Sequence, residues 1–195
     1  MTRTTPRRTT FTTRDSASAT RCICTGGPAI DSVRAARAAD ATDIARIYDQ
    51  GIAERIATFE TKARTAADIV ALLAERDGRY PTVVVEREGR VVAWAGASEY
   101  RPREVYAGIA EFSVYVDRAA RGTGAGTAAM RGLIEACEAK GFWKLVSRVF
   151  PENIASRRLL ASLGFREVGT YERHARLDGE WKDVVIVEKR IGPAA

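Results

Sequence analysis

The residues best suited to chemistry lie in one stretch, from Glu111 to Met130. The run 112–116 is β-branched and aromatic, which predicts a strand. Three glycines follow, Gly122, Gly124 and Gly126, and then a helical pattern. A strand, a glycine turn and a helix start together can bind a phosphate. Glycines let backbone N–H groups converge, and the helix N-terminus adds unpaired donors and a partial positive charge.

The spacing of this turn separates it from two common phosphate-binding loops. No Gly-Lys-Ser/Thr follows, which excludes a Walker loop, and the glycines do not fit G-x-G-x-x-G. The pattern R-x-x-G-x-G does fit, with Arg121, Gly124 and Gly126 in register. A glycine-rich turn between a strand and a helix can also be purely structural, so the rest of the chain has to decide.

Length and charge limit the classes of protein. A chain of 195 residues suits one domain with a full core. No apolar run approaches the ~20 residues of a membrane span, so no membrane partner is expected. Residues 1–30 hold five arginines against one aspartate, which leaves about two of the six net positive charges for the rest. That is too little for a nucleic-acid partner.

The ends of the chain and its cysteines suggest how it is organised. Residues 1–30 are rich in Thr, Arg, Ser, Ala and Gly and are expected to be a disordered basic extension, with a transit peptide as the alternative. Residues 31–195 are expected to form one domain. Cys22 and Cys24 could bind a soft metal, but no His or third Cys lies nearby, so no metal is predicted. Cys137 falls on an apolar helix face, and cysteine usage favours a reducing, cytoplasmic setting.

The predicted elements follow the order β-α-α-β-β-β-α-β-α-β-β, which indicates a mixed α/β sheet. We expect strands at 32–36, 80–86, 90–100, 112–116, 145–149, 165–172 and 184–190, and helices from about 40, from 65, over 124–140 and over 153–163. Asp40 is expected to cap the first helix, and Thr65 with Asp68 the second. Glu88-Gly89 and Asp178-Gly179 predict hairpin turns.

This order resembles that of the GNAT N-acetyltransferases, whose acyl-CoA pyrophosphate loop is similar to the R-x-x-G-x-G stretch. Asn153 with Ala155-Ser156, followed by Leu163-Gly164-Phe165, resembles the final N-x-A-S … L-G-F segment of the family. Within the family the chain looks most like the phosphinothricin and arsinothricin acetyltransferases. That resemblance is carried by residues 57–59, 101–106, 110–116 and 179–184.

The resemblance implies a GNAT fold, an α/β (α+β) arrangement. It would have a mixed central sheet of about seven strands, helices on both faces and splayed central strands. It also implies an acetyl-CoA-dependent N-acetyltransferase that needs no metal. The substrate would be the α-amino group of a small anionic amino acid such as phosphinothricin, arsinothricin or methionine sulfoximine, and the role would be detoxification or antibiotic resistance. Dimers are common in the family, so a homodimer is one expectation.

The resemblance also assigns roles to residues. Glu111 matches the catalytic glutamate, which removes a proton from the substrate ammonium directly or through water. We expect burial at the strand start to make it a better proton acceptor, and a solvated strand-end carboxylate is the alternative. The coenzyme would be held by Val114, Tyr115, Val116, Arg121, Gly122, Thr123, Gly124, Ala125, Gly126, Thr127 and Asn153. The backbone N–H groups of 114–116 would stabilise the oxyanion.

The anionic end of the substrate needs several hydrogen-bond donors. Arg101 and Arg103 lie in a loop before the central strand, and guanidinium groups suit oxyanions, although a solvated turn is the alternative. Tyr106 matches a family tyrosine and could add a hydroxyl donor, while Phe59 could wall the pocket. Arg148 is either a further anion ligand or a paired arginine at the edge of the core.

One position departs from the family. Many relatives carry Tyr or His on the last helix to protonate the departing thiolate, but this chain has Leu160. Either the thiolate leaves unaided, or water, Ser156 or Tyr171 supplies the proton. His174, the single histidine, is expected at the surface.

Two other functions stay open. One is acetylation of a protein N-terminus or a polyamine, although the Arg101–Arg103 loop does not suit a cationic substrate. The other is a non-catalytic acyl-CoA-binding module, suggested by Leu160.

Overall fold

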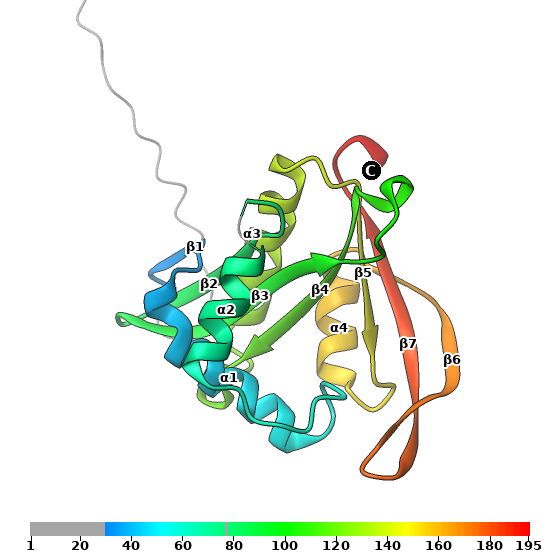
Figure 1. Cartoon of the computed structure of the whole chain (residues 1–195), viewed down its shortest axis with the longest axis horizontal. Helices are drawn as coiled ribbons and strands as arrows, with labels where there is room; N and C mark the ends of the chain where they lie inside the picture. The colour runs from blue at the N-terminus through cyan, green and yellow to red at the C-terminus, as the bar shows by residue number, and fades with distance from the viewer. Residues whose placement is uncertain (1–29, 77) are drawn as a thin grey trace, which may run out of the picture.

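The computed structural model describes residues 30–76 and 78–195, so the predicted extension with Cys22 and Cys24 lies outside the described residues. The strands are β1 (Ser32–Ala35), β2 (Thr82–Arg87), β3 (Arg90–Glu99), β4 (Ile109–Val116), β5 (Lys144–Val149), β6 (Arg166–Leu177) and β7 (Glu180–Arg190). The helices are α1 (Ala41–Glu54), α2 (Ala66–Arg76), α3 (Ala125–Ala139) and α4 (Ile154–Ser162). This order of elements confirms the predicted one (Figure 1).

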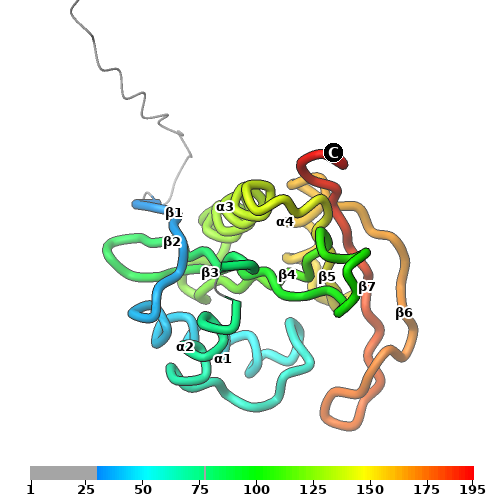
Figure 2. Tube along the Cα trace, turned by 45° about the horizontal axis from the view of Figure 1, so that its top comes forward, coloured from blue at the N-terminus to red at the C-terminus, as the bar shows by residue number. Residues whose placement is uncertain are grey.

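One mixed sheet of seven strands, in the order β1-β2-β3-β4-β5-β7-β6, forms the middle layer. Helices α1 and α2 cover one face, and α3 and α4 cover the other (Figure 2). Neighbouring strands run antiparallel except β4 and β5, which are parallel. The expected fold class, with helices on both faces, is confirmed.

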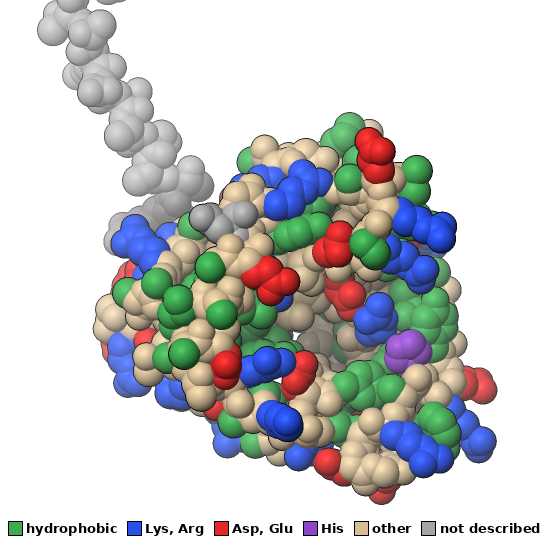
Figure 3. Space-filling model, viewed as in Figure 1, with side chains coloured by type: hydrophobic (Ala, Val, Ile, Leu, Met, Phe, Trp, Pro, Cys, Tyr) green, Lys and Arg blue, Asp and Glu red, His purple; other side chains and the backbone are tan. Residues whose placement is uncertain are grey.

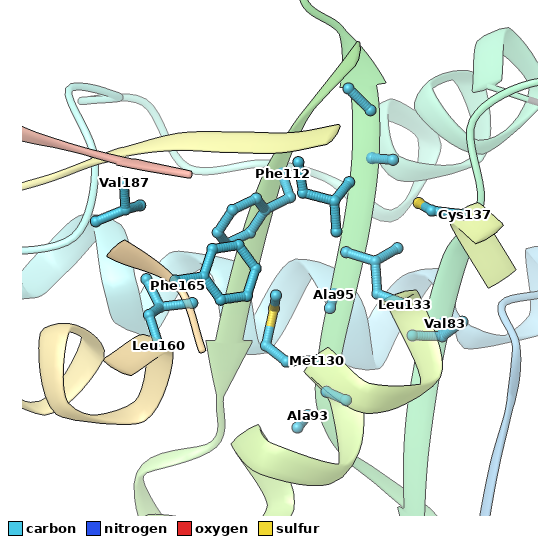
Figure 4. Close-up of a cluster of buried hydrophobic side chains, with 14 of the residues drawn as sticks. Val83, Ala93, Ala95, Phe112, Met130, Leu133, Cys137, Leu160, Phe165 and Val187 are labelled. Carbon is cyan, nitrogen blue, oxygen red and sulfur yellow. The ribbon is translucent and has the colours of Figure 1, made fainter. Parts of the chain in front are cut away.

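The side chains of β4 alternate between the two faces, as the strand period of two requires. Phe112 points into the core beneath α3 and α4, and Tyr115 belongs to the cluster beneath α1 and α2. Figure 4 shows Phe112 beside Phe165 and Leu160, with Met130 of α3 close by; the two phenylalanine ring centres are 5.0 Å apart. Glu111, one residue before Phe112, therefore faces the α1 and α2 side.

Local signals predicted most turns and caps. Glu88 and Gly89 have positive φ angles of 51° and 70°, as the predicted hairpin turn needs. Thr65 and Asp68 form the expected capping box, because Thr65 N donates to Asp68 Oδ2 at 2.8 Å and Asp68 N to Thr65 Oγ1 at 3.1 Å. Asp40 stands at the N-cap position of α1, as expected, but its carboxylate pairs with Arg34 at 2.7 Å and makes no cap bond to the helix.

The last hairpin is longer than its sequence suggested. Strand β6 extends to Leu177 and β7 begins at Glu180, although both were expected to stop short of the turn. Residues 173–176 and 180–183, which the sequence left out of the two strands, are exposed or only partly buried and show no alternating apolar pattern. Ala175, Arg176 and Leu177 pair with 180–182 of β7 beyond an irregularity between Tyr171 and Ala175.

Cys137 lies in the core of α3 with no exposed surface, as expected. Burial, more than any neighbouring charge, raises the pKa of its thiol to about 12. We predict that it does not react with a thiol reagent at pH 8 in the native protein, because the thiolate is the reactive form. Peptide mass spectrometry after labelling checks this. Labelling of Cys137 without denaturant would contradict it.

Candidate active site

The central strands separate in the middle of the sheet. The parallel pairing of β4 with β5 ends at Glu111 and Val146. In the described part of the chain, the rest of β4 pairs with β3 alone, while β5 continues along β7. The Ser147 hydroxyl reaches across the opening and donates to the Phe112 carbonyl at 2.8 Å. The predicted splay is therefore present, and it begins directly after Glu111.

A pocket lies in this opening, and Figure 3 shows the surface hollowed there, with acidic and basic side chains around the hollow. Its walls come from β4, β5, the start of α4 and the segment after α1. The lining residues are Ala57, Phe112, Ser113, Val114, Tyr115, Ser147, Arg148, Val149, Phe150, Asn153, Ser156 and Leu160. The pocket therefore includes Val114 and Tyr115, two of the three residues expected to bind the thioester through their backbone.

The glycine turn lies beyond β4 and leads into α3. Gly122 and Gly124 have φ angles of 74° and 86°, and a Cβ built on either would meet nothing within 4 Å. The first helical bond runs from Ala128 N to Gly124 O, so the three intervening amides have no partner within the helix. These open, positively polarised N–H groups fit a diphosphate.

Gly126 has a different reason to lack a side chain. A Cβ there would lie 3.2 Å from both Leu159 and Val116, so this glycine lets α3 pack closely against β4 and α4. The two glycines that match the R-x-x-G-x-G pattern thus serve different ends: Gly124 sets the turn, and Gly126 allows the packing.

Arg121 is already engaged within the protein. Its Nη1 donates to Glu54 at 3.0 Å, and Glu54 also accepts from Arg118 at 2.6 Å. Burial opposes the charge on Glu54, but the hydrogen bonds from the two arginines outweigh it and hold the pKa of that carboxyl below its usual range. Arg121, which the motif assigned to the coenzyme, is therefore already paired in this structure, although it shares one carboxylate with Arg118 and the trio keeps a net positive charge.

Asn153 lies at the pocket, and its side chain already makes two hydrogen bonds. Its Oδ1 accepts from Ser156 N at 3.1 Å, which caps α4, and its Nδ2 donates to Ile56 O at 3.1 Å. The second bond joins α4 to the segment between α1 and α2. Asn153 thus shapes the pocket, and its predicted contact with the coenzyme would use its second amide hydrogen or second lone pair.

Glu111 stands at the last paired position before the strands diverge. Its Oε1 accepts a hydrogen bond from Arg148 Nη1 at 2.8 Å, and 28% of its side chain is exposed. The carboxylate is therefore partly exposed and paired, and not desolvated as expected. Sequence periodicity could not reveal its partner, an arginine 37 residues away. The second carboxylate oxygen has no hydrogen-bond partner among residues 30–76 and 78–195.

Aromatic side chains form one side of the cleft. Phe59 packs edge-on against Phe150 at 4.8 Å between ring centres, and the His174 ring lies 6.3 Å from Phe59. His174 is exposed, as expected, but it borders this wall. Tyr115 packs against Tyr48 of α1 at 4.7 Å between ring centres, and burial is the main cause that raises the pKa of the Tyr115 hydroxyl, which stays protonated.

The loop that joins β3 to β4 reaches the same end of the sheet as Glu111. Arg101 and Arg103 are exposed and form no ion pair within the described ranges; Arg101 lies over the Tyr100 ring at 5.3 Å. Tyr106 packs edge-on against Tyr100 at 5.8 Å, which holds the loop in shape. Both guanidinium groups are thus available to an anion, but neither lines the pocket between β4 and β5.

The described residues contain no group of three or more His, Cys, Asp or Glu that could hold a metal ion. None of their helices is both long enough and apolar enough to cross a bilayer.

The chain also matches known proteins. Residues 45–165 match the model of the acetyltransferase (GNAT) family. The chain belongs to the GNAT acetyltransferase family. A phosphinothricin N-acetyltransferase of Alcaligenes faecalis is 32% identical over 171 residues, which is 87% of this chain and 83% of that protein.

Two further relatives of this GNAT enzyme have a similar degree of identity. An L-methionine sulfoximine/L-methionine sulfone acetyltransferase of Pseudomonas aeruginosa is 30% identical, over 83% of this chain and 95% of its own. The crystal structure of a phosphinothricin acetyltransferase from Sinorhizobium meliloti in complex with AcCoA superposes with a TM-score of 0.77. It is 31% identical and covers 83% of this chain and 88% of its own. The enzyme is thus an acetyl-CoA-dependent N-acetyltransferase.

Proposed function

We propose that this GNAT enzyme acetylates the α-amino group of a small anionic amino acid of the phosphinothricin, arsinothricin or methionine sulfoximine type, in detoxification or antibiotic resistance. The observation that carries the proposal is the Glu111–Arg148 ion pair beside the pocket. An α-amino acid has an ammonium and a carboxylate side by side, and the pair offers one charge of each sign to match them. The names of the relatives support the same substrate class.

In this proposal one end of the cleft binds the coenzyme, and the other end takes the proton from the substrate. The turn from Gly122 to Thr127 holds the diphosphate of acetyl-CoA. When bound, acetyl-CoA supplies the activated acetyl group. The backbone of Val114 to Val116, beyond the last β4–β5 pair, lies beside the thioester oxygen. Glu111 takes the proton from the substrate ammonium through its free carboxylate oxygen, directly or through one water.

The proton for the departing thiolate has fewer sources than the sequence allowed. Leu160 is buried and lines the pocket, so it offers no acid. Ser156 also lines the pocket, whereas Tyr171 is 54% exposed on β6 and does not. We therefore assign this step to Ser156, to water, or to unassisted departure of the thiolate.

Arg101 and Arg103 are proposed to bind the anionic side chain of the substrate. Replacing both by Gln should raise the KM for phosphinothricin about tenfold or more with little change in kcat, because a charge-assisted hydrogen bond that ground state and transition state share is worth about 1.5–3 kcal/mol. Methionine sulfone has no charged side-chain group, so its KM should change much less. Steady-state kinetics with both substrates measures the difference.

A matched control is Arg176→Gln, which removes an exposed arginine in the last hairpin. It should leave both KM values near those of the wild type. An equal rise in KM for phosphinothricin and methionine sulfone in the double variant would show that the loop does not bind the anionic side chain of the substrate.

The substrate class itself is tested by a thiol-release assay with acetyl-CoA and a panel of amines. The panel contains phosphinothricin, arsinothricin, methionine sulfoximine, spermidine and a peptide with a free N-terminal alanine. We expect turnover with the amino acids. Turnover confined to spermidine or the peptide would favour the second function, and binding of CoA without release for any amine would favour a non-catalytic module.

A cytoplasmic location and a homodimer remain predictions. Gel filtration with light scattering tests the second.

A further inference from the structure

A buried arginine that no sequence motif indicated donates hydrogen bonds to the glycine turn. Arg87, the last residue of β2, is only 7% exposed. Its Nη1 donates to Thr123 Oγ1 at 2.9 Å, and its Nη2 lies 3.5 Å from the Thr123 carbonyl oxygen. The Thr123 hydroxyl in turn donates to Ala120 O at 2.6 Å. One buried guanidinium thus holds Thr123, and the Thr123 hydroxyl in turn holds Ala120 at the start of the turn that precedes α3.

The charge of Arg87 is not balanced by any carboxylate of the described residues. Among residues 30–76 and 78–195 it forms no ion pair with an Asp or Glu, and its Nε is buried without a hydrogen-bond partner. Arg118 and Arg121, the other arginines close to the turn, share the carboxylate of Glu54. A buried charge without a partner is costly, so a compensating anion is expected nearby.

Two carboxylates at the turn are already paired, Asp117 with Arg46 and Glu54 with Arg118 and Arg121. Between Asp117 and Glu135 the chain contains no acidic residue. The unpaired amides at the start of α3 add positive polarisation beside the same turn. Gly122 and Gly124 leave open space where side chains would otherwise stand.

We infer that Arg87 is a positioning residue for the diphosphate of the coenzyme. It holds Thr123 in place and contributes a buried positive charge that the diphosphate balances, whereas Arg121 is exposed and shares the Glu54 carboxylate with Arg118. The inference rests on the placement of the diphosphate at the glycine turn, but it does not depend on which amine is acetylated.

Calorimetric titration of CoA, with no amine present, tests this directly. Arg87→Met should raise the Kd for CoA about tenfold or more, since a hydrogen bond to a charged group is lost and the turn is released. Arg90→Met removes an exposed charge from the same hairpin and should leave the Kd within about twofold. Wild-type affinity in Arg87→Met would overturn the inference.

A comparison of acetyl donors separates positioning from a merely structural role. With any amine that the wild type accepts, Arg87→Met should lower kcat/KM for acetyl-CoA but barely change it for S-acetylpantetheine, which lacks the diphosphate. Equal losses with both donors would show that the arginine only supports the fold.

Two milder variants decide the matter if Arg87→Met does not fold. Arg87→Lys keeps the charge but cannot make both contacts, and Thr123→Val removes the hydroxyl while Arg87 stays. Each should weaken CoA binding by a few-fold, and wild-type affinity in both would contradict the inference. Gly124→Val serves as a separate control: if it binds CoA normally, the diphosphate lies elsewhere.

Discussion

Replacing Glu111 by Gln should lower kcat about 100-fold or more at neutral pH, because a positioned general base typically contributes that much. The variant keeps the shape of the side chain and can still accept a hydrogen bond from Arg148, so the KM for the amino acid should change little. The residual rate should rise with pH, since the amine then loses its proton to solvent and needs no base. Thiol-release kinetics across pH 7–10 measure both effects.

The matched control is Glu99→Gln, which changes an exposed carboxylate at the end of the neighbouring strand β3. It should retain wild-type kcat. A Glu111→Gln enzyme with wild-type kcat at neutral pH would reject Glu111 as the base. A large loss that high pH does not relieve would instead point to a role in binding or structure.

Substituting Gly124 by Val should raise the Kd for CoA about 100-fold, through the loss of two charge-assisted hydrogen bonds to backbone amides. The φ of 86° strains a β-branched residue, so the turn would shift and its amides would no longer converge. A Cβ there has open space, so the core should survive and the Tm should fall by only about 2–8 °C. Calorimetry and thermal unfolding together test this.

Gly141→Val is the matched control for that strain. Gly141 has a φ of 80°, a Cβ there would also meet nothing within 4 Å, and it stands at the other end of α3. It should lower the Tm to a similar extent without weakening CoA binding. Equal Kd values for the two variants would remove the glycine turn from the coenzyme site.

Local chemistry made much of the fold predictable from the sequence. The hairpin turn at Asp178 and Gly179 has φ angles of 51° and 88°, and the capping box at Thr65 and Asp68 starts α2 as expected. These signals act over a few residues, so the sequence contains them in full. Asp40 shows the limit, because Arg34 and the buried position of its carboxylate override its preference for a cap.

The sequence predicted the motifs of the candidate site but not which charged side chains pair with one another there. The glycines were identified from their spacing, and Glu111 from the resemblance to the GNAT family. The arginines that decide how charge is distributed lie far away in the chain: Arg148 is 37 residues from Glu111, and Arg87 is 36 from Thr123. Such contacts arise only when β-strands and α3 pack together, so no local periodicity reveals them.

In the proposed function, Arg148 binds the carboxylate of an α-amino acid beside the acetyl-donor site while Glu111 faces its ammonium group. The most direct test compares kcat/KM for phosphinothricin with that for its decarboxylated analogue, which keeps the amine and the phosphinate. We predict a preference for phosphinothricin of about tenfold or more, from the carboxylate contact to Arg148, and a much smaller preference in Arg148→Met. Equal or better turnover of the decarboxylated amine by the wild-type enzyme would contradict the account.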